Sequence, residues 1–335
     1  MRGLCSGEAN LGRRVLKQRS GLAKIVRVTR VSVRELVVLG SASQVPTRHR
    51  NHNGYFLRWD HEGILFDPGE GTQRQMLHAG VAASAITRIC ITHLHGDHCL
   101  GLPGVIQRLA LDRVDHPIDL YYPASGQAYI DRLRAASIFH DTTEIRCHPI
   151  DCDGVVEEDA PATFGLLARQ LDHGVESVGY QIVEPDGLRM VAQRLAERGI
   201  AGPRVRELQR VGSLHTEHGM VALDEVSEVK RGQRFAFVMD TRICANAVEL
   251  ARRADLFVCE STFVTADARL AEAYGHLTAR QAAEIARDAN ARLLVLTHFS
   301  QRYSDADLLV EEAADVFANV IAAHDLLRVA VPPRL

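Results

Sequence analysis

Four side chains of ligand type stand within six positions of one another, directly after a short apolar run. The run RICIT predicts a buried strand, and His93, His95, Asp97 and His98 follow it in the sequence HLHGDH. Alternate side chains of an extended backbone share one side, so His93 and His95 can meet at one point. A turn at the intervening glycine lets Asp97 and His98 reach a second point. Imidazole and carboxylate groups together suit Zn²⁺, so the spacing predicts a metal site.

Three further polar residues end apolar strands in the same way. His173 follows ATFGLLARQLD, Asp240 follows FAFVM, and His298 follows ARLLVLT. Side chains that lie beyond the carboxyl ends of strands converge in open α/β sheets, even when they are distant in sequence. We therefore expect these three residues to join the first four.

The elements that must position these residues alternate between short apolar runs and helical stretches, which is typical of a layered α/β fold. Strands are predicted at residues 35–39, 54–59, 63–66, 88–92, 119–122, 163–171, 179–183, 235–239, 256–259 and 292–297. Helices are predicted at residues 73–79, 100–111, 125–137, 188–198, 245–251, 278–289 and 305–316. The pattern predicts one domain over 34–335, with a helical insertion at 184–215, after an extension at 1–33.

Composition is that of an ordinary globular protein, with 46% hydrophobic and 24% charged residues. Seven cysteines without a CxxC pair favour reduced thiols in a cytoplasmic protein. No apolar run approaches the roughly 20 residues of a membrane span. Residues 1–34 carry nine basic side chains and one acid, although the whole chain has a net charge of -3. The extension 1–33 therefore suits a disordered basic tail or transit segment, unless the start codon lies further downstream.

The order HxHxDH, His, Asp, His resembles that of the metallo-β-lactamase superfamily, and the resemblance runs from about residue 34 to the C-terminus. It implies a four-layer αβ/βα sandwich with two Zn²⁺ per subunit at one edge of its sheets. One zinc would be held by His93, His95, His173 and Asp240. The other would be held by Asp97, His98, Asp240 and His298. Asp67, after another apolar strand, resembles a carboxylate that orients a ligand histidine.

Two zinc ions at one site imply hydrolysis. They can share a hydroxide at neutral pH and stabilise the attacking and leaving oxygens of an in-line displacement. Asp97 is the best candidate to orient or deprotonate the water. These features predict a hydrolase and leave its substrate open.

Two segments near this set resemble the tRNase Z family of tRNA-processing endonucleases. PTRHRN resembles the family's PxKxRN loop, with Arg48 at the usual lysine, and implies that Arg48, Arg50 and Asn51 bind substrate. A solvated basic loop is the alternative. YGHLT, after CESTF, resembles the segment whose histidine protonates the leaving 3′-oxygen, which would be His276. Alternatively, His276 caps the helix that begins near Thr278.

Two more segments carry the same resemblance. HFSQRY resembles the family's HxSxRY ending, in which Ser300 and Arg302 would contact phosphate, unless Arg302 only pairs with a local acid. Residues 184–215 contain GIAGP and six arginines, and they resemble the family's flexible arm, or exosite, which grips the tRNA elbow. An amphipathic helical hairpin is the alternative for this insertion.

The resemblance implies a zinc endoribonuclease that removes the 3′ trailer from precursor tRNA, leaving a tRNA 3′-hydroxyl and a trailer 5′-phosphate. It also implies a homodimer in which the arm of one subunit holds tRNA for the active site of the other, with no membrane partner. Two alternatives remain. One is a small-molecule esterase, thioesterase or sulfatase on the same scaffold, and the other is a metal-free RNA-binding scaffold.

Overall fold

The computed structural model describes residues 33–157 and 164–334. The chain falls into two units, Met1–Ser32 and Val33–Leu335. Apart from Val33, the extension predicted at 1–33 lies outside the described residues, as does the first residue of the strand predicted at 163–171. Among the described helices, none has the length and apolar character that crossing a bilayer requires.

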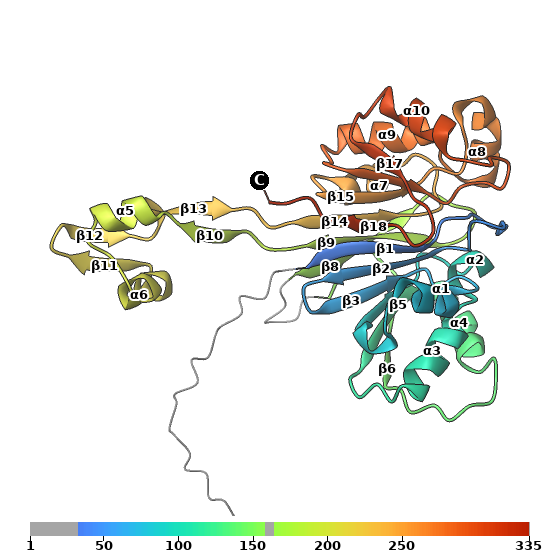
Figure 1. Cartoon of the computed structure of the whole chain (residues 1–335), viewed down its shortest axis with the longest axis horizontal. Coiled ribbons are helices and arrows are strands. Elements are labelled where there is room, and N and C mark those ends of the chain that lie inside the picture. The colour runs from blue at the N-terminus through green and yellow to red at the C-terminus, as the bar shows by residue number, and fades with distance from the viewer. Residues whose placement is uncertain (1–32, 158–163, 335) are drawn as a thin grey trace, which may run out of the picture. The chain divides into compact units, whose positions relative to one another are not determined.

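Two seven-stranded sheets form the centre of the second unit (Figure 1). The first sheet has the order β18-β1-β2-β3-β4-β5-β6 and the second has the order β17-β16-β15-β14-β9-β8-β7. The strands of the first sheet are β1 Arg34–Gly40, β2 Gly54–Trp59, β3 Glu62–Phe66, β4 Arg88–Cys90, β5 Ile118–Pro123, β6 Ile145–Ile150 and β18 Arg328–Ala330. Those of the second are β7 Gly154–Glu157, β8 Gly165–Leu171, β9 Ser177–Val183, β14 Arg234–Val238, β15 Leu256–Glu260, β16 Leu294–Thr297 and β17 Val320–Ala322.

Helices cover the outer faces of both sheets. Beside the first sheet lie α1 Thr72–Ala79, α2 Gly96–Cys99, α3 Leu102–Leu111 and α4 Gln127–Arg134. Beside the second lie α7 Ala245–Ala251, α8 Ala268–Tyr274, α9 Ala279–Asp288 and α10 Asp307–Ala314. This is the four-layer αβ/βα sandwich that the sequence predicted, and the prediction is confirmed.

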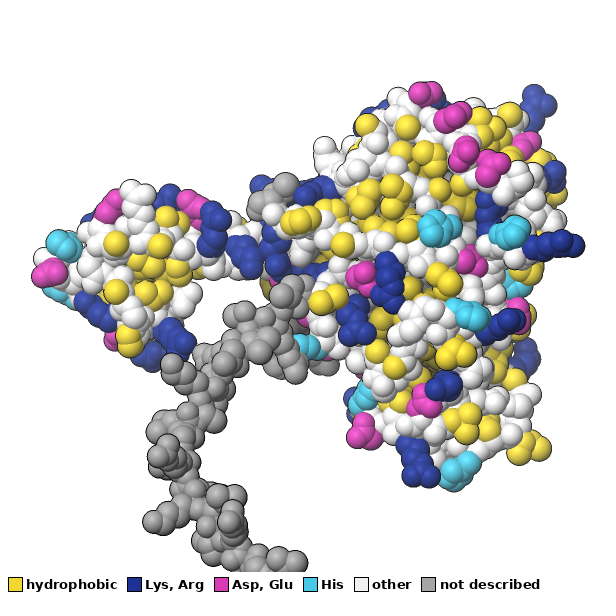
Figure 2. All heavy atoms as spheres, in the orientation of Figure 1, with side chains coloured by type: hydrophobic (Ala, Val, Ile, Leu, Met, Phe, Trp, Pro, Cys, Tyr) yellow, Lys and Arg dark blue, Asp and Glu magenta, His cyan; other side chains and the backbone are white. Residues whose placement is uncertain are grey.

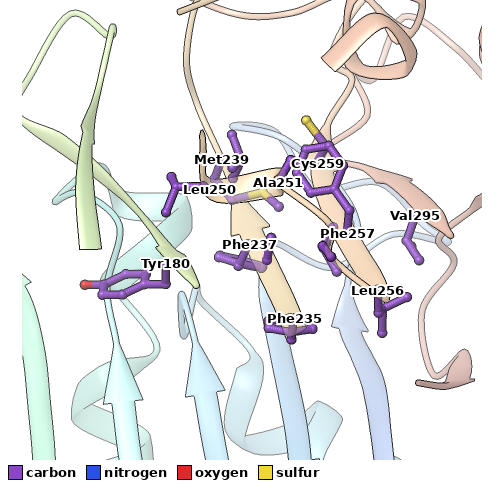
Figure 3. Packing of buried hydrophobic residues seen from close by; sticks show 14 of the residues in the cluster. Tyr180, Phe235, Phe237, Met239, Leu250, Ala251, Leu256, Phe257, Cys259 and Val295 are labelled. Carbon is purple, nitrogen blue, oxygen red and sulfur yellow. The ribbon is translucent and has the colours of Figure 1, made fainter. Parts of the chain in front are cut away.

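Alternation along the strands builds two separate cores. In β1, Leu36 and Val38 are part of the core between the sheets, while Val37 and Leu39 pack under the helices of the first sheet. Aromatic rings join the two sheets, because Phe66 of β3 stacks on Phe237 of β14 with ring centroids 4.6 Å apart. Figure 3 shows Phe237 with its neighbours in this core. A rigid support therefore lies directly behind the ends of β14, β15 and β16.

The insertion between β9 and β14 is called the arm here, and its elements run from residue 187 to 230. They are β10 Gly187–Met190, α5 Ala192–Glu197, α6 Pro203–Val211, β11 Ser213–Thr216, β12 Gly219–Ala222 and β13 Ser227–Lys230. β10 pairs with β13, and β11 pairs with β12. The arm has a small core of its own, with buried Leu195, Leu208 and Val221. Residues 188–190 are strand rather than the predicted helix, because β10 is held by a partner some 40 residues away in sequence.

Candidate active site

The ends of strands from both sheets bring the seven predicted ligand residues together. His93 and the three residues that follow it in the motif stand between β4 and the end of α2, while His173 follows β8. Asp240 follows β14, and His298 follows β16. The geometry therefore matches the expected convergence at the carboxyl ends of the strands.

Asp240 lies between two groups of imidazoles and offers one carboxylate oxygen to each. Its Oδ2 is 3.5 Å from Nε2 of His93 and 3.8 Å from Nε2 of His173. Its Oδ1 is 3.5 Å from Nε2 of His98 and 3.1 Å from Nε2 of His298. One carboxylate thus faces two possible cation positions.

The other two predicted ligands complete the two groups. Nδ1 of His95 lies 2.9 Å from Nε2 of His93 and 3.4 Å from Nε2 of His173. Oδ2 of Asp97 lies 3.3 Å from Nε2 of His98 and 3.5 Å from Nε2 of His298. Within each of two sets, one His93–His95–His173–Asp240 and the other Asp97–His98–His298, the ligand atoms lie within 4.8 Å of one another. Each set can surround one cation.

Two buried polar atoms at the centre of the cluster test whether a metal fits. Oδ1 of Asp240 and Nε2 of His298 lie 3.1 Å apart, but neither forms a hydrogen bond with the other or with any other described residue. A buried polar group without a partner costs about 1–3 kcal/mol, and a cation between these atoms would satisfy both. Burial lowers the pKa of His93 well below its usual value, which keeps its imidazole neutral and its lone pair free. The donor set fits a divalent metal ion.

Further polar contacts fix the orientation of these imidazoles. Oδ2 of Asp67 accepts from Nδ1 of His98 at 2.8 Å, and both carboxylate oxygens of Asp67 also bind Thr92. Nδ1 of His298 lies 2.7 Å from Oγ1 of Thr262. In each ring Nδ1 is occupied, which is the usual arrangement of metal-binding histidines. Nε2 of His298 is left for the centre of the cluster, whereas Nε2 of His98 also lies 3.2 Å from Nδ2 of Asn53. The predicted orienting position of Asp67 agrees with this geometry, whereas Thr262 was not predicted.

Three residues of the cluster have a left-handed backbone. The φ angles are 43° at Asp67, 29° at Asp240 and 61° at His298. Each residue follows the end of a strand, where the chain must change direction sharply to aim the side chain at the centre. Such conformations cost on the order of 1–3 kcal/mol each and persist where surrounding structure enforces them.

His276 stands beside the cluster without belonging to the predicted ligand set. Its Nδ1 is 3.0 Å from Oε1 of Glu260, which is completely buried at the end of β15. Burial alone would lower the pKa of His276, but the negative charges of Glu260 and Asp240 raise it to about 9. The N-cap of α9 is Thr278, which forms a capping box with Gln281, so His276 does not cap that helix. Glu260 was missed in the sequence, where its only signal is an acid that ends an apolar strand.

A cavity of about 550 Å³ opens over the cluster. Its lining includes Asp97 and His276 together with Ser300 and Arg302, the predicted phosphate-contacting residues. Arg302 forms no ion pair with any residue that the structure describes, so it is not held by a local acid. Tyr274 lies at this cavity and is 61% exposed, which leaves an aromatic surface open to solvent.

Within the described chain, the loop that carries the predicted substrate-binding residues Arg48, Arg50 and Asn51 does not contribute these side chains to the cavity. Arg48 is exposed. Nη1 of Arg50 donates to the carbonyl of Tyr303 at 2.8 Å, and Nδ2 of Asn51 donates to the carbonyl of Glu70 at 2.8 Å. Arg50 and Asn51 therefore hold the loop in place, and a role of these residues in substrate binding stays a prediction.

Known proteins share both this fold and much of the sequence. Residues 47–229 match the Metallo-beta-lactamase superfamily model, and residues 217–299 match a Beta-lactamase superfamily domain. The chain is 60% identical over 306 residues to Ribonuclease Z of Nocardia farcinica, covering 91% of this chain and all of that protein. It is 50% identical over 297 residues to Ribonuclease Z of Protochlamydia amoebophila, covering 89% of this chain and 96% of that protein. The chain belongs to the ribonuclease Z family.

A solved structure agrees with this membership. The short form of human tRNase Z superposes with a TM-score of 0.66 at 26% identity, covering 89% of this chain and all of that one. A diphosphatase of the PhnP family reaches a TM-score of 0.60 at 18% identity, which shows a shared fold alone. Membership in the ribonuclease Z family makes the protein an endoribonuclease, and the small-molecule hydrolase alternative is not favoured.

Proposed function

We propose that the protein removes the 3′ trailer from precursor tRNA, leaving a 3′-hydroxyl on the tRNA and a 5′-phosphate on the trailer. The observation that carries this proposal is the His276–Glu260 pair beside the cluster of seven candidate metal ligands, in a chain 60% identical to a ribonuclease Z. A ribose hydroxylate is a poor leaving group, so cleavage of a phosphodiester benefits from a proton donor at this position.

Two Zn²⁺ ions are proposed for the cluster, with the ligand sets that the resemblance implies. The first set is His93, His95, His173 and Asp240, and the second set is Asp97, His98, Asp240 and His298. The split of the two Asp240 oxygens between the two groups supports a bridging role for this carboxylate. When bound, zinc supplies a water of lowered pKa and positive charge that stabilises the phosphate oxygens.

Asp97 is proposed to orient the attacking water. Burial alone would raise its pKa, but His98 and His298 hold that pKa far below the usual value. Its carboxylate is therefore ionised at neutral pH and can accept a hydrogen bond from water. This fixes the direction of attack on the phosphorus.

His276 is proposed as the general acid. Glu260 occupies Nδ1, so Nε2 remains to donate a proton to the leaving 3′-oxygen. Glu260 is itself held by the backbone N–H of Thr241 and by the hydroxyl of Thr262, at 3.0 and 2.7 Å. It acts as a positioning residue, because it keeps the imidazole in one orientation and favours its protonated form. Bound zinc would oppose the rise in the pKa of His276 through its positive charge.

The arm is proposed to bind the tRNA elbow, with α6 supplying contacts to phosphate. Arg206 and Arg210 lie four residues apart in this helix, and both are exposed. Neither forms an ion pair with a described residue. Gly202, with a φ of 55°, and Pro203 begin the helix within the GIAGP run. Exposed arginines on a separately packed arm suit an RNA helix, which proteins hold by shape and phosphate contacts.

Topology supports a homodimer in which two subunits share one tRNA. Val183 at the end of β9 pairs with Arg234 at the start of β14, while Asp240 follows the opposite end of β14. The arm therefore leaves the second sheet at the strand ends opposite those that carry the candidate metal ligands of the same subunit. A tRNA held by this arm would present its 3′ end more easily to the site of a second subunit.

One assay tests the proposed reaction directly. Purified protein is incubated with a 3′-extended tRNA, with and without chelator, and both product ends are mapped. The proposal expects a metal-dependent cut that leaves a 3′-hydroxyl on the tRNA. Cleavage elsewhere, or no cleavage after reloading with zinc, would show that the substrate is wrong.

A further inference from the structure

A second cavity, of about 240 Å³, lies at the amino ends of β14, β15 and β16. The cluster of ligand residues lies at the carboxyl ends of the same parallel strands, so the two sites are at opposite edges of this sheet. Asp186, which lines the cavity, immediately precedes β10, and Arg231 immediately follows β13. The cavity is therefore at the base of the arm, where both connections to the body meet. Figure 2 shows Lys and Arg side chains gathered where the arm joins the body.

Arginines from four separate segments line this cavity, and they outnumber its acids. The arginines are Arg231, Arg234, Arg253, Arg292 and Arg334. The acids are Asp186 and Asp255. Five guanidinium groups around so small a volume repel one another unless an anion lies among them.

The two acids are already engaged by other groups. Oδ1 of Asp255 accepts from Nη1 of Arg292 at 2.6 Å, and its Oδ2 accepts from the backbone N–H of Arg234 at 2.8 Å. Oδ1 of Asp186 accepts from the backbone N–H of Gly232 at 2.9 Å. These carboxylates shape the loops around the cavity. Asp255 pairs with Arg292, and Glu184 pairs with Arg334. The guanidinium groups of Arg231, Arg234 and Arg253 are left without an acidic partner among the described residues.

Several guanidinium donors have no protein acceptor among the described residues, although those of Arg231 and Arg253 are exposed to solvent. The side chains of Arg231 and Arg253 form no hydrogen bond or ion pair with any described residue. Arg234 donates to the neutral carbonyl of Arg252 at 3.3 Å. Nη2 of Arg334 donates to Glu184, but its Nε is buried and has no partner among the residues that the structure describes. A buried donor without an acceptor is unfavourable, so an anion in the cavity would remove this cost.

We propose that this cavity is a second phosphate-binding site and that its occupant is a backbone phosphate of the RNA that the arm holds. Arginine forks match the oxygens of phosphate, and a cluster of them is the usual device for binding it. The volume is below the roughly 300–1,000 Å³ of sites that enclose drug-sized ligands, so it suits a phosphate group rather than a whole nucleotide. The choice of RNA rests on the proposed function, whereas phosphate recognition rests on the cavity alone.

The test compares the double variant Arg231→Gln/Arg253→Gln with the wild-type chain. Glutamine removes the charge and keeps a long polar side chain. Arg113→Gln is a single-charge control, because Arg113 is exposed, lies outside the cavity and forms no ion pair with a described residue. Three quantities are measured: inorganic phosphate binding by calorimetry, cleavage of a 3′-extended tRNA at several salt concentrations, and turnover of a nitrophenyl phosphodiester. Thermal unfolding checks that each variant is folded.

The double variant should lose one class of phosphate site and should cleave tRNA with a KM about fivefold higher at ~0.15 M salt, which is the effect of one lost phosphate contact. The slope of log KM against log salt should fall by roughly one. Turnover of the small ester should not change, because the ligand cluster is at the other edge of the sheet. The control should behave like the wild type.

The outcomes distinguish an RNA phosphate from a free phosphate, and they distinguish failure of the site from failure of the proposed function. Lost phosphate binding with an unchanged KM for tRNA would overturn the RNA assignment and indicate a free phosphate-bearing molecule. Unchanged phosphate binding and unchanged KM would overturn the site itself. If the wild type binds phosphate through these arginines and yet cleaves no 3′-extended tRNA, the proposed function fails and the phosphate site stands.

Discussion

Two arginines on the exposed face of α6 offer the sharpest test of how the arm binds RNA. Arg206 and Arg210 have no acidic partner among the described residues, whereas Arg189 and Arg194 both pair with Glu228, at 2.8 and 2.9 Å. An arginine that already binds a carboxylate has less to gain from a phosphate. Arg206→Gln/Arg210→Gln should therefore weaken tRNA binding more than Arg189→Gln/Arg194→Gln.

The magnitude follows from the number of free arginines. Each phosphate contact releases about 0.9 counterion, so two lost contacts should reduce the salt slope by about 1.8. At ~0.15 M salt this corresponds to a loss of affinity of about 30-fold. Turnover of a small phosphodiester should be unchanged, because α6 packs on the arm's own core through Leu208.

The assay is steady-state cleavage of a 3′-extended tRNA between about 50 and 200 mM salt, a range in which such contacts change affinity steeply. Both double variants remove two positive charges, so they alter the long-range electrostatic attraction equally. An equal loss in the two variants would mean that overall charge, and not contact through α6, holds the RNA. No loss in either would remove the arm from the binding of tRNA.

Three further predictions concern the cluster and the fold. Asp240→Ala should lose both metals and activity together, since its two oxygens face both groups, and a variant that retains two zinc ions by elemental analysis would exclude bridging. His276→Ala should keep zinc and the KM for tRNA while kcat falls roughly 10²-fold or more. A substrate with sulfur as the 3′-bridging atom should restore most of this loss, because a thiolate leaves without a proton donor. An equal loss of kcat on both substrates would make His276 structural. Glu184→Gln should lower the free energy of unfolding at pH 7 by about 1–3 kcal/mol, because Glu184 binds Arg34 and Arg334. Burial would raise the pKa of Glu184, but these arginines lower it to about 2, so its stabilisation is present above pH ~4.5 and disappears as the pH falls through about 2. Denaturant unfolding at several pH values measures this, and a difference that persists at pH 2 would contradict it.

The sequence predicted the central strands well and the short peripheral ones poorly. The predicted strand 54–59 coincides with β2, because buried residues mark it at every position except the half-buried Arg58. The structure also has β11 and β13, which the sequence did not predict. These strands are four residues long and half of their residues are exposed, so they lack an apolar pattern. They exist because β12 and β10 pair with them.

The same distinction applies to the cluster. Its seven expected ligands were recognisable because each is a histidine or aspartate that follows an apolar strand. Glu260 ends β15 and Thr262 follows it, yet their importance lies in contacts with His276 and His298, which are 16 and 36 residues away in sequence. No local pattern encodes such a contact. It becomes visible only when β15 and β16 are placed side by side.

The unfavourable features of the cluster explain why it is built where it is. Local free energy is lost in two ways. The backbone is left-handed at Asp67, Asp240 and His298. In addition, Oδ1 of Asp240 and Nε2 of His298 are buried without a hydrogen bond. Asp240 follows β14 and His298 follows β16, and every residue of β16 and of the intervening β15 is buried. Their packing fixes the strand ends so firmly that the strained residues cannot relax. A cation between the two Asp240 oxygens and the surrounding imidazoles would then recover the cost of the unpartnered atoms. The same rigidity extends to the amino ends of these strands, where the arginine-lined cavity lies. One set of strands thus positions both a candidate catalytic centre and a candidate phosphate site.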